Sequence, residues 1–418
     1  MGLKAFKIYY MQSFRAFKHR NFKLLFIGQA ITLLGTWLQR TAVVWLIYRL
    51  TNSAFLLGLV GFVSLIPSLV LGPLAGNYVE RKDGLKLLKY LQALFLVQAA
   101  VLAVMVYLHI FNVPIIIFLV TTQGITNAYE VTCRQALMAD LIDDKADLPN
   151  AIALNSTIIN LTRVVGPAIA GVLLAKVGEG ICFLINALSF IPFIMLLNSM
   201  KLPARTAKKQ VASVWEELKA GYYYVRSDKE IWGLLMLLTA VSFILVPFTT
   251  LLPIFAKDIF DGSSGTFGLF EGSLAVGSVI AAVYMARLKN PETLVGVSMV
   301  AVGLFSVGLI ILAFSGNLHI ALFAAVVGGC GMMGHTSSVN TYIQTHARQD
   351  MRSRAISYFV MAYMGISPLG CLLLGEVASK MKPREVVILE AFLGLVSLGI
   401  YAWYRTRASQ KQVLAGSI

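Results

Sequence analysis

The sequence is 418 residues long, and 58% of these residues are hydrophobic whereas only 13% are charged. Soluble globular proteins carry about 25% charged residues, so this chain lacks the polar surface of a water-soluble enzyme and is predicted to lie in a lipid bilayer. A net charge of +15 would suggest nucleic-acid binding in a soluble protein. Here the basic residues lie in short segments between apolar runs, so nucleic acid is not an expected partner.

The N-terminal segment, residues 1–23, is basic and amphipathic and has no small-residue cleavage site. It is therefore not a cleavable signal peptide, and the first spanning helix is expected to direct the chain to the membrane. A helix needs about 20 mostly apolar residues to cross a bilayer. With this criterion the sequence predicts twelve spanning helices, at residues 22–48, 54–76, 86–108, 114–137, 150–175, 180–198, 231–255, 266–287, 293–315, 318–342, 355–378 and 386–404.

One long polar interval, residues 201–230, divides the predicted helices into two groups of six. It is predicted to be a cytoplasmic linker with a short amphipathic helix, VWEELKAGYYYV. A weak internal repeat matches helices 4 and 5 with helices 10 and 11, and both pairs end in a small-residue helix with a central proline, Pro167 or Pro368. We therefore expect an all-α membrane protein built from two pseudo-symmetric six-helix bundles, residues 1–200 and 231–418, around a central cavity.

The distribution of basic residues predicts the orientation of these helices. With both termini in the cytoplasm, 26 Lys and Arg residues fall on the cytoplasmic side and six on the opposite side. This asymmetry supports an even number of spans and cytoplasmic termini. It leaves three arginines inside apolar segments, Arg40, Arg134 and Arg163.

Two stretches of the first half resemble a known family: FRAFKHRNFKLLFIGQAITLLGTWLQR, in the first helix, and RQALMADLIDDKADLPNAIALNSTIINLTRVVGPAIAG, in helices 4 and 5. They resemble the major facilitator superfamily, and within it the bacterial drug:proton antiporters that include the enterobactin exporter. The resemblance extends from about Phe14 to Arg405. It implies alternating access, a multi-pass protein of the bacterial inner membrane and a small-molecule substrate. We expect a monomer.

The loop after the second helix, GNYVERKDGLKLL, occupies the position of the signature loop of this superfamily. Four of its residues match or nearly match the signature, whereas the basic pair that usually ends it is replaced by Gly84 and Leu85. The resemblance implies a gating latch in which the loop arginine reaches an acid of helix 4, either Glu130 or Asp140. Glu130 could instead pair with Arg134 on its own helix face. The predicted latch residues are Gly76, Glu80, Arg81, Lys86, Glu130, Arg134 and Asp140.

The intramembrane charges predict a substrate cavity with basic character. A charge in a spanning helix costs at least about 2.5–3.5 kcal/mol, so Arg40 is expected to face either a wet cavity with an anionic substrate or the membrane surface. Arg163 needs a partner among the polar residues of helices 4 and 5. The predicted cavity residues are Trp37, Gln39, Arg40, Gln123, Asn127, Asn155, Arg163, His335 and Asn340.

Three residues are candidates for coupling transport to protons: Glu130, Glu271 and His335. A buried carboxyl or a histidine can exchange a proton near neutral pH. The alternatives are a solvated helix start for Glu271 and a neutral, hydrogen-bonded histidine inside the bundle for His335. No acidic residue lies within the first helix, where several drug antiporters carry one.

Several motifs that would indicate other chemistry are missing from the sequence. It contains no Walker loop, nucleophile elbow or H-E-x-x-H, so neither ATP nor a hydrolase mechanism is expected. The four cysteines are isolated in apolar segments, so we expect no metal, disulfide or cofactor.

The combined prediction is a secondary active transporter that exports an amphiphilic organic molecule, such as a siderophore or drug-like compound, in exchange for protons. A lysophospholipid or other lipid carrier, or an importer of the same fold, remains an alternative.

Overall fold

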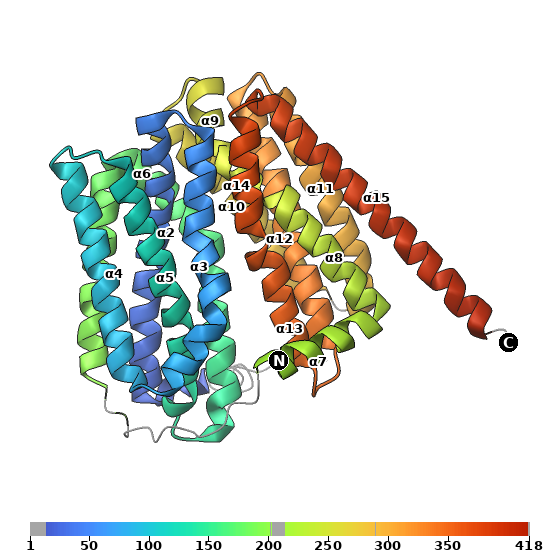
Figure 1. Ribbon diagram of the computed structural model, residues 1–418, viewed down its shortest axis with the longest axis horizontal. Helices are drawn as coiled ribbons and strands as arrows, with labels where there is room; N and C mark the ends of the chain where they lie inside the picture. Colours follow the sequence, from blue (N-terminus) through green and yellow to red (C-terminus); the bar gives the residue numbers. More distant parts are fainter. Residues whose placement is uncertain (1–13, 201, 203–213, 289, 417–418) are drawn as a thin grey trace, which may run out of the picture. The chain divides into compact units, whose positions relative to one another are not determined.

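The computed structural model describes residues 14–200, 202, 214–288 and 290–416, and within these residues every regular element is helical. The first part of the chain forms η1 (Arg15–Lys18), α2 (Arg20–Thr51), α3 (Ala54–Glu80), α4 (Gly84–Tyr107), α5 (Val113–Leu137), η2 (Met138–Asp140), η3 (Lys145–Asp147) and α6 (Leu148–Asn198). The second part forms α7 (Val214–Ser227), α8 (Lys229–Ile244), η4 (Val246–Leu251), α9 (Leu252–Ile254), η5 (Phe255–Ile259), α10 (Ser264–Arg287), η6 (Pro291–Thr293), α11 (Leu294–Phe314), α12 (Leu318–His346), α13 (Arg352–Val360), η7 (Met361–Gly365), α14 (Ser367–Ala378) and α15 (Pro383–Gly416). Figure 1 labels the long helices.

Several helices begin at a polar residue that caps free backbone N–H groups. The Asp83 carboxylate accepts from the N–H groups of Leu85 and Lys86 at the start of α4, and Asn112 and Asn317 cap α5 and α12 in the same way. Caps of this kind fix where an apolar run becomes helical, because the bilayer offers no water to satisfy the first N–H groups.

Ten segments of the described residues are long and apolar enough to cross a membrane. One of them contains α6, which covers both predicted helices 150–175 and 180–198. Gly178, with φ 75° and ψ 176°, is the non-helical residue inside α6, and it lies between those two predictions. α5 has 25 residues but a more polar composition, and it is not among the ten. The twelve-helix count therefore stays a prediction, while the helical membrane architecture is clear.

Two predicted helices of the second half are less regular than expected. The span predicted at 231–255 leaves α-helical geometry after Ile244 and continues through η4, α9 and the π-helical turn η5. Pro247 and Pro253 lie in this stretch, and proline has no N–H to donate to the helix. The span at 355–378 contains the π-helical turn η7 just before Pro368.

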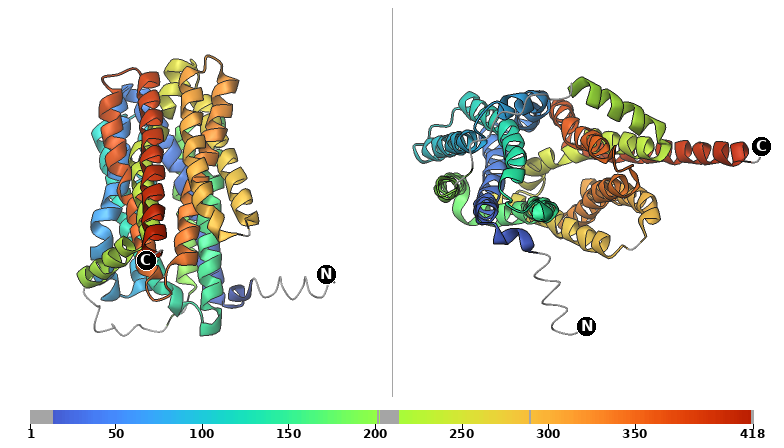
Figure 2. Two further views of the ribbon diagram at one scale, coloured as in Figure 1. Left: turned by 90° about the vertical axis from the view of Figure 1, so that its right-hand side faces the viewer. Right: turned by 90° about the horizontal axis from the view of Figure 1, so that it is seen from below.

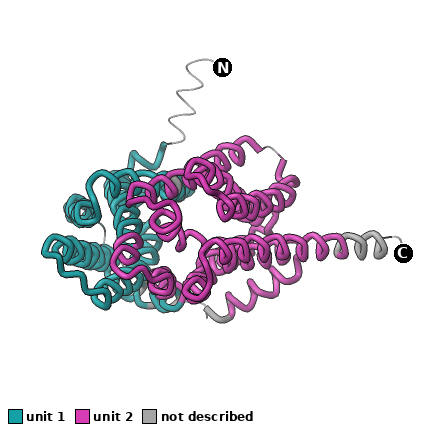
Figure 3. Tube along the Cα trace, turned by 90° about the horizontal axis from the view of Figure 1, so that it is seen from above, with its two compact units in different colours: residues 1–43, 70–210 teal, residues 44–69, 211–418 magenta. Residues whose placement is uncertain are grey.

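The chain divides into two compact units (Figure 3): unit 1 contains residues 1–43 and 70–210, and unit 2 contains residues 44–69 and 211–418. The core of unit 1 includes Phe22, Phe193 and Leu197, all fully buried. Large apolar side chains such as Phe118 and Met195 are exposed on its helices, as a lipid-facing surface requires.

Unit 2 includes α7, which is formed by the predicted amphipathic segment VWEELKAGYYYV and the two residues after it. This helix packs against α13. The Tyr358 hydroxyl donates to the Leu218 carbonyl at 2.9 Å, and the Arg348 N–H donates to the Tyr224 hydroxyl at 2.8 Å. The last turns of α15 extend beyond the other helices of the unit (Figures 1 and 2).

Candidate functional site

The predicted cavity residues of α2 surround an aromatic side chain of unit 1. The Arg40 guanidinium is exposed and lies 5.2 Å from the centre of the Trp37 ring, which is a cation–π geometry. Trp37 packs so closely against Gly166 of α6 that a Cβ there would lie 2.4 Å from the indole. Arg163, one turn before Gly166, is half-buried. Of the two arginines, Arg40 lies over the indole, and Arg163 precedes by three residues the glycine that the indole contacts.

Gln39 belongs to a buried chain of amides in unit 1. Its Nε2 donates to Gln98 of α4 at 2.9 Å, and its Oε1 accepts from Nδ2 of Asn186 in α6 at 2.7 Å. All three side chains are buried, so the amides join α2, α4 and α6 through the core. Its role as a cavity residue stays a prediction, and the structure gives it a cross-linking position.

Glu130 and Arg134 form the ion pair that their spacing in the sequence allows. The Arg134 guanidinium lies 3.5 Å from the Glu130 carboxylate, and both side chains are buried in unit 1. Gln92 of α4 also donates to Glu130, at 3.4 Å. Because a buried charge needs a partner, this pair accounts for both intramembrane charges on α5.

The predicted latch residues lie on two parts of the chain: Gly76, Glu80, Arg81 and Lys86 at or near the turn between α3 and α4, and Glu130, Arg134 and Asp140 on α5 and η2. Arg81 and Lys86 are exposed, and Lys86 lies 3.8 Å from Asp83, the cap of α4. Gly76 has open space where a Cβ would lie, Asp140 is half-buried in η2, and the side chain of Glu80 lies outside the described part. The latch stays a prediction.

The remaining predicted cavity residues of unit 1 lie on α5 and α6. Gln123 and Asn155 are half-buried, and Asn127 is exposed. These levels of burial suit residues that border a polar space, while their role stays a prediction.

In unit 2, His335 lies in the interior of the helix bundle. It is fully buried on α12, and its Nδ1 lies 2.8 Å from the Ser298 hydroxyl of α11, while Nε2 has no partner among the described residues. Asn340, one to two turns further on, accepts from Gln344 at 3.1 Å, and Glu271 is half-buried near the start of α10. The structure thus brings together His335 and Ser298, and it leaves proton coupling by His335 or Glu271 as a prediction.

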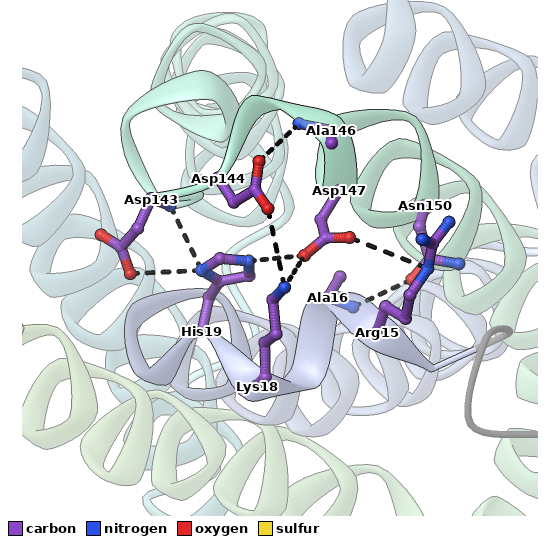
Figure 4. Close-up of polar contacts among 9 residues, drawn as sticks. All are labelled: Arg15, Ala16, Lys18, His19, Asp143, Asp144, Ala146, Asp147 and Asn150. Carbon is purple, nitrogen blue, oxygen red and sulfur yellow. Dashed lines mark hydrogen bonds and ion pairs between the residues drawn. The ribbon is translucent and has the colours of Figure 1, made fainter.

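The sequence analysis missed a charged cluster of unit 1, shown in Figure 4. Asp147 of η3 is only 2% exposed and accepts from Lys18 at 2.6 Å and from His19 Nε2 at 3.1 Å. Arg15 Nε lies 3.8 Å from the same carboxylate. The hydrogen bond to Asp147 raises the pKa of Lys18. The cluster fastens η1 to the connection between α5 and α6.

His19 occupies the centre of this cluster, which we call the Asp147 cluster (Arg15, Lys18, His19, Asp143 and Asp147). Its Nδ1 lies 3.2 Å from both the backbone N–H and the carboxylate of Asp143 (Figure 4). A neutral ring can accept from the N–H, and a protonated ring can donate to the carboxylate. Either protonation state therefore finds a partner.

A second contact region that was not predicted lies within unit 2. It joins the end of α2 and the start of α3 to η5, α10 and α14. The Tyr48 hydroxyl donates to Asp258, and Lys257 donates to Asn52. Trp45 stacks on Phe267 with ring centres 5.8 Å apart. A Cβ at Gly58 of α3 would lie 2.9 Å from the Cα of Gly375 in α14, so glycines allow these two backbones to touch.

One more buried group was missed: Glu390 of α15, which is 4% exposed and has no hydrogen-bond partner for either carboxylate oxygen among the described residues. In the same residues, no group of three or more His, Cys, Asp or Glu side chains is arranged to hold a metal ion.

These features define a multi-pass membrane transporter of the major facilitator fold. A bacterial homologue of the human lysosomal transporter Spinster, solved in an inward-facing and unoccupied conformation, has a TM-score of 0.67 at 12% identity and covers 92% of this chain and 97% of its own. A bacterial homologue of the iron transporter ferroportin in an inward-facing state has a TM-score of 0.66 at 17% identity, with 92% and 98% covered.

The chain belongs to the transmembrane secretion effector family, whose family model matches residues 11–415. It is similar to the staphyloferrin A transporter of Staphylococcus aureus, with 29% identity over 84% of this chain and 88% of that protein. Macrolide efflux protein A of Streptococcus pyogenes is 23% identical, over 80% of this chain and 83% of that protein. The enterobactin exporter of Shigella boydii is 26% identical, with 91% of both chains covered. The family confirms the predicted superfamily and a transport function.

Proposed function

We propose that this protein exports a siderophore, an anionic iron chelator, in exchange for protons. The observation that carries the proposal is the likeness to the staphyloferrin A transporter over 84% of the chain, supported by the likeness to the enterobactin exporter. The second supporting feature is the basic character of unit 1 around Trp37.

The arginines near Trp37 favour an anionic substrate. A cation inside a spanning helix is costly, and an incoming carboxylate or phenolate provides the opposite charge. Arg40 is exposed and its guanidinium lies 5.2 Å from the centre of the indole, so the planar guanidinium can form paired hydrogen bonds with such a group. Arg163 adds a second cation one turn from Gly166, on which the indole rests.

The proposal includes the location and orientation of the chain. We place it in the bacterial inner membrane with both termini in the cytoplasm, supported by the 26-to-6 distribution of basic residues. We also propose that residues 1–200 and 231–418 are the two repeated halves, joined by the linker 201–230.

A transport assay with purified protein in proteoliposomes tests the function. Labelled staphyloferrin A is expected to accumulate against its gradient when a pH gradient is imposed, and to equilibrate only when the gradient is collapsed. The likeness to macrolide efflux protein A makes a macrolide the second candidate substrate. Transport of erythromycin without transport of staphyloferrin A or enterobactin would mean that the substrate is a drug and not a siderophore. Transport of a lysolipid alone would contradict both assignments.

Substitutions of Arg40 test its proposed contact with the substrate. Arg40→Ala is expected to raise the KM for the siderophore about tenfold, because a hydrogen bond to a charged group contributes about 1.5–3 kcal/mol. Arg40→Lys keeps the charge and loses the planar guanidinium. Its KM is expected to lie between those of the wild type and Arg40→Ala. An unchanged KM in both variants would show that Arg40 does not contact the substrate.

A further inference from the structure

The strongest unassigned feature of the molecule is the carboxyl group of Glu390, buried where α15 packs against α8 and α11. The side chain is 4% exposed, and neither oxygen has a hydrogen-bond partner among the described residues. It lies seven residues from Pro383, so about 10 Å along α15 from that end of the helix. This depth places it inside the apolar part of a spanning segment.

The elements that pack against α15 are α8, α11, α14 and η4, and α8, α11 and η4 offer Glu390 no counter-charge. α11 contains no ionisable residue, and η4 contains none. The ionisable residues of α8 are Lys229 and Glu230, and Glu230 pairs with Tyr401 and Arg405 of α15. Tyr401 is eleven residues beyond Glu390, about 16 Å away along the helix.

The remaining charged groups near α15 are engaged elsewhere. Glu376 of α14 pairs with Lys380, and Arg384 donates to the carbonyl of Ser315 at 3.0 Å. A carboxylate at position 390 would therefore be an uncompensated charge in the core, which is far more costly than a neutral acid. In the conformation described, the neutral acid is therefore the less costly form of Glu390.

Burial alone would also suit a permanently protonated, structural acid, but such a group normally donates its O–H to an acceptor. Glu390 lacks that acceptor, and an unsatisfied buried polar group costs about 1–3 kcal/mol. Neither protonation state is well stabilised in this conformation. A second conformation, in which water or a partner reaches the carboxyl, would remove this cost.

Two further hydroxyls in the same region also lack partners. Ser306 of α11 faces Gly394, one turn from Glu390: a Cβ at Gly394 would lie 2.7 Å from the Ser306 Oγ and 2.8 Å from a Leu245 methyl group. Ser242 of α8, three residues before Leu245, is fully buried as well, and neither serine hydroxyl has a hydrogen-bond partner in the described part of the chain. These hydroxyls provide acceptors and donors for water that enters between α8, α11 and α15.

We infer that Glu390 is a proton-binding site in the core of unit 2, which takes up and releases the proton that drives transport; this inference rests on the proton-coupled function proposed above. The step moves one proton and no other atom. A proton from the aqueous phase on one side adds to a carboxylate oxygen and gives the neutral acid. The same O–H bond later breaks, and the proton leaves to the aqueous phase on the other side.

A transport experiment separates this inference from the proposed function. Wild-type protein, Glu390→Gln and the control Glu376→Gln are compared in proteoliposomes with labelled staphyloferrin A, with and without a pH gradient. Glu390→Gln is expected to lose gradient-driven accumulation by about tenfold or more and to keep exchange of labelled for unlabelled substrate, while Glu376→Gln keeps both. A Glu390→Gln variant that still responds like the wild type overturns this inference alone. A wild-type protein that ignores the gradient overturns the proposed function, and this inference with it.

A second measurement needs no substrate, and it tests the inference even if a variant loses transport because it folds poorly. Infrared spectra of the wild-type protein in detergent are recorded from acidic to alkaline pH. The carbonyl band that the wild type shows and Glu390→Gln lacks is expected to decrease with rising pH above the range in which exposed carboxyls titrate, and Ser306→Ala is expected to shift the pH of half-decrease. The Glu390→Asp variant should keep a titrating band. A band that is the same at every pH means a permanently protonated acid and overturns the inference.

Discussion

Two carboxyl groups of this protein are buried to nearly the same extent and have opposite surroundings. Asp147 in unit 1 is 2% exposed and is contacted by Arg15, Lys18 and His19. Glu390 in unit 2 is 4% exposed and has no partner among the described residues. Burial is therefore not what decides whether a carboxyl carries a charge in this fold. The charged residues that the neighbouring elements supply decide it.

The difference follows from where each group lies along its helix. Asp147 directly precedes α6, and the neighbouring segment η1 has the sequence RAFK. Glu390 faces α11, whose 21 residues include no ionisable side chain. Basic residues collect at helix ends because they are costly inside the bilayer, so Asp147 at a helix end has basic neighbours. An acid inside a helix needs a dedicated partner, which Glu130 has in Arg134 and which the elements packed against α15 do not supply.

The largest expected effect comes from removing the paired carboxylate. Asp147→Ala removes the buried carboxylate that both Lys18 and His19 contact, and it should lower the unfolding temperature in detergent by roughly 5 °C or more, measured by differential scanning fluorimetry. The matched control is Asp144→Ala, since that side chain is 58% exposed, lies 3.8 Å from Lys18 and otherwise accepts from the backbone N–H of Ala146. Equal shifts for the two variants would show that the Asp147 cluster contributes nothing special.

Glu390→Leu should change stability in the opposite direction. Replacing an unsatisfied polar group by an apolar one of similar size is expected to stabilise the protein by about 1–3 kcal/mol, while abolishing gradient-driven transport. The unfolding temperature of this variant is measured beside that of Asp147→Ala. A loss of stability similar to that of Asp147→Ala would mean that Glu390 has a structural partner, and the contrast between the two carboxyls would fail.

His19→Ala should have an intermediate effect on stability. The ring bridges Asp143 and Asp147, and losing its hydrogen bonds is expected to cost about 1–2 kcal/mol. Chemical unfolding followed by tryptophan fluorescence measures this cost. If His19→Ala and Asp147→Ala destabilise the protein by the same amount, and the double variant by no more, the two residues act as one unit.

Arg15→Ala should have the smallest effect. Arg15 is 53% exposed and its Nε lies 3.8 Å from Asp147, and exposed pairs of this kind contribute less than about 0.5 kcal/mol. The same unfolding assay applies, at low and at high salt. A larger, salt-dependent loss would show that Arg15 belongs to the electrostatic core of the cluster.

The helices were predictable because apolar length is a direct requirement of the bilayer. The boundary between predicted helices 150–175 and 180–198 coincides with the non-helical Gly178. The irregular stretch after Ile244 was not predicted, although Pro247 and Pro253 were visible in the sequence. Hydropathy does not distinguish an α-helix from a π-helical turn such as η5, since both bury the same side chains.

The polar residues were harder to place than the helices. Charge inside an apolar run drew attention to Arg40, Arg134 and Arg163, and the same criterion applied to acids would have identified Glu390 eight positions into α15. The spacing of Glu130 and Arg134 indicated their ion pair. Gln39 could not be assigned to a cavity or a core from sequence, because its hydrogen-bond partners lie 59 and 147 residues away.

The Asp147 cluster also imposes an order on biosynthesis. His19 leaves the ribosome 128 residues before Asp147, so at about 5–20 residues per second roughly 6–26 s pass between the synthesis of the two partners. During this interval α2 to α5 are already available for insertion, whereas η1 has no carboxylate to bind. The N-terminal segment can thus dock on Asp147 only after the four helices α2 to α5 have emerged, which makes its attachment a late step in the assembly of unit 1.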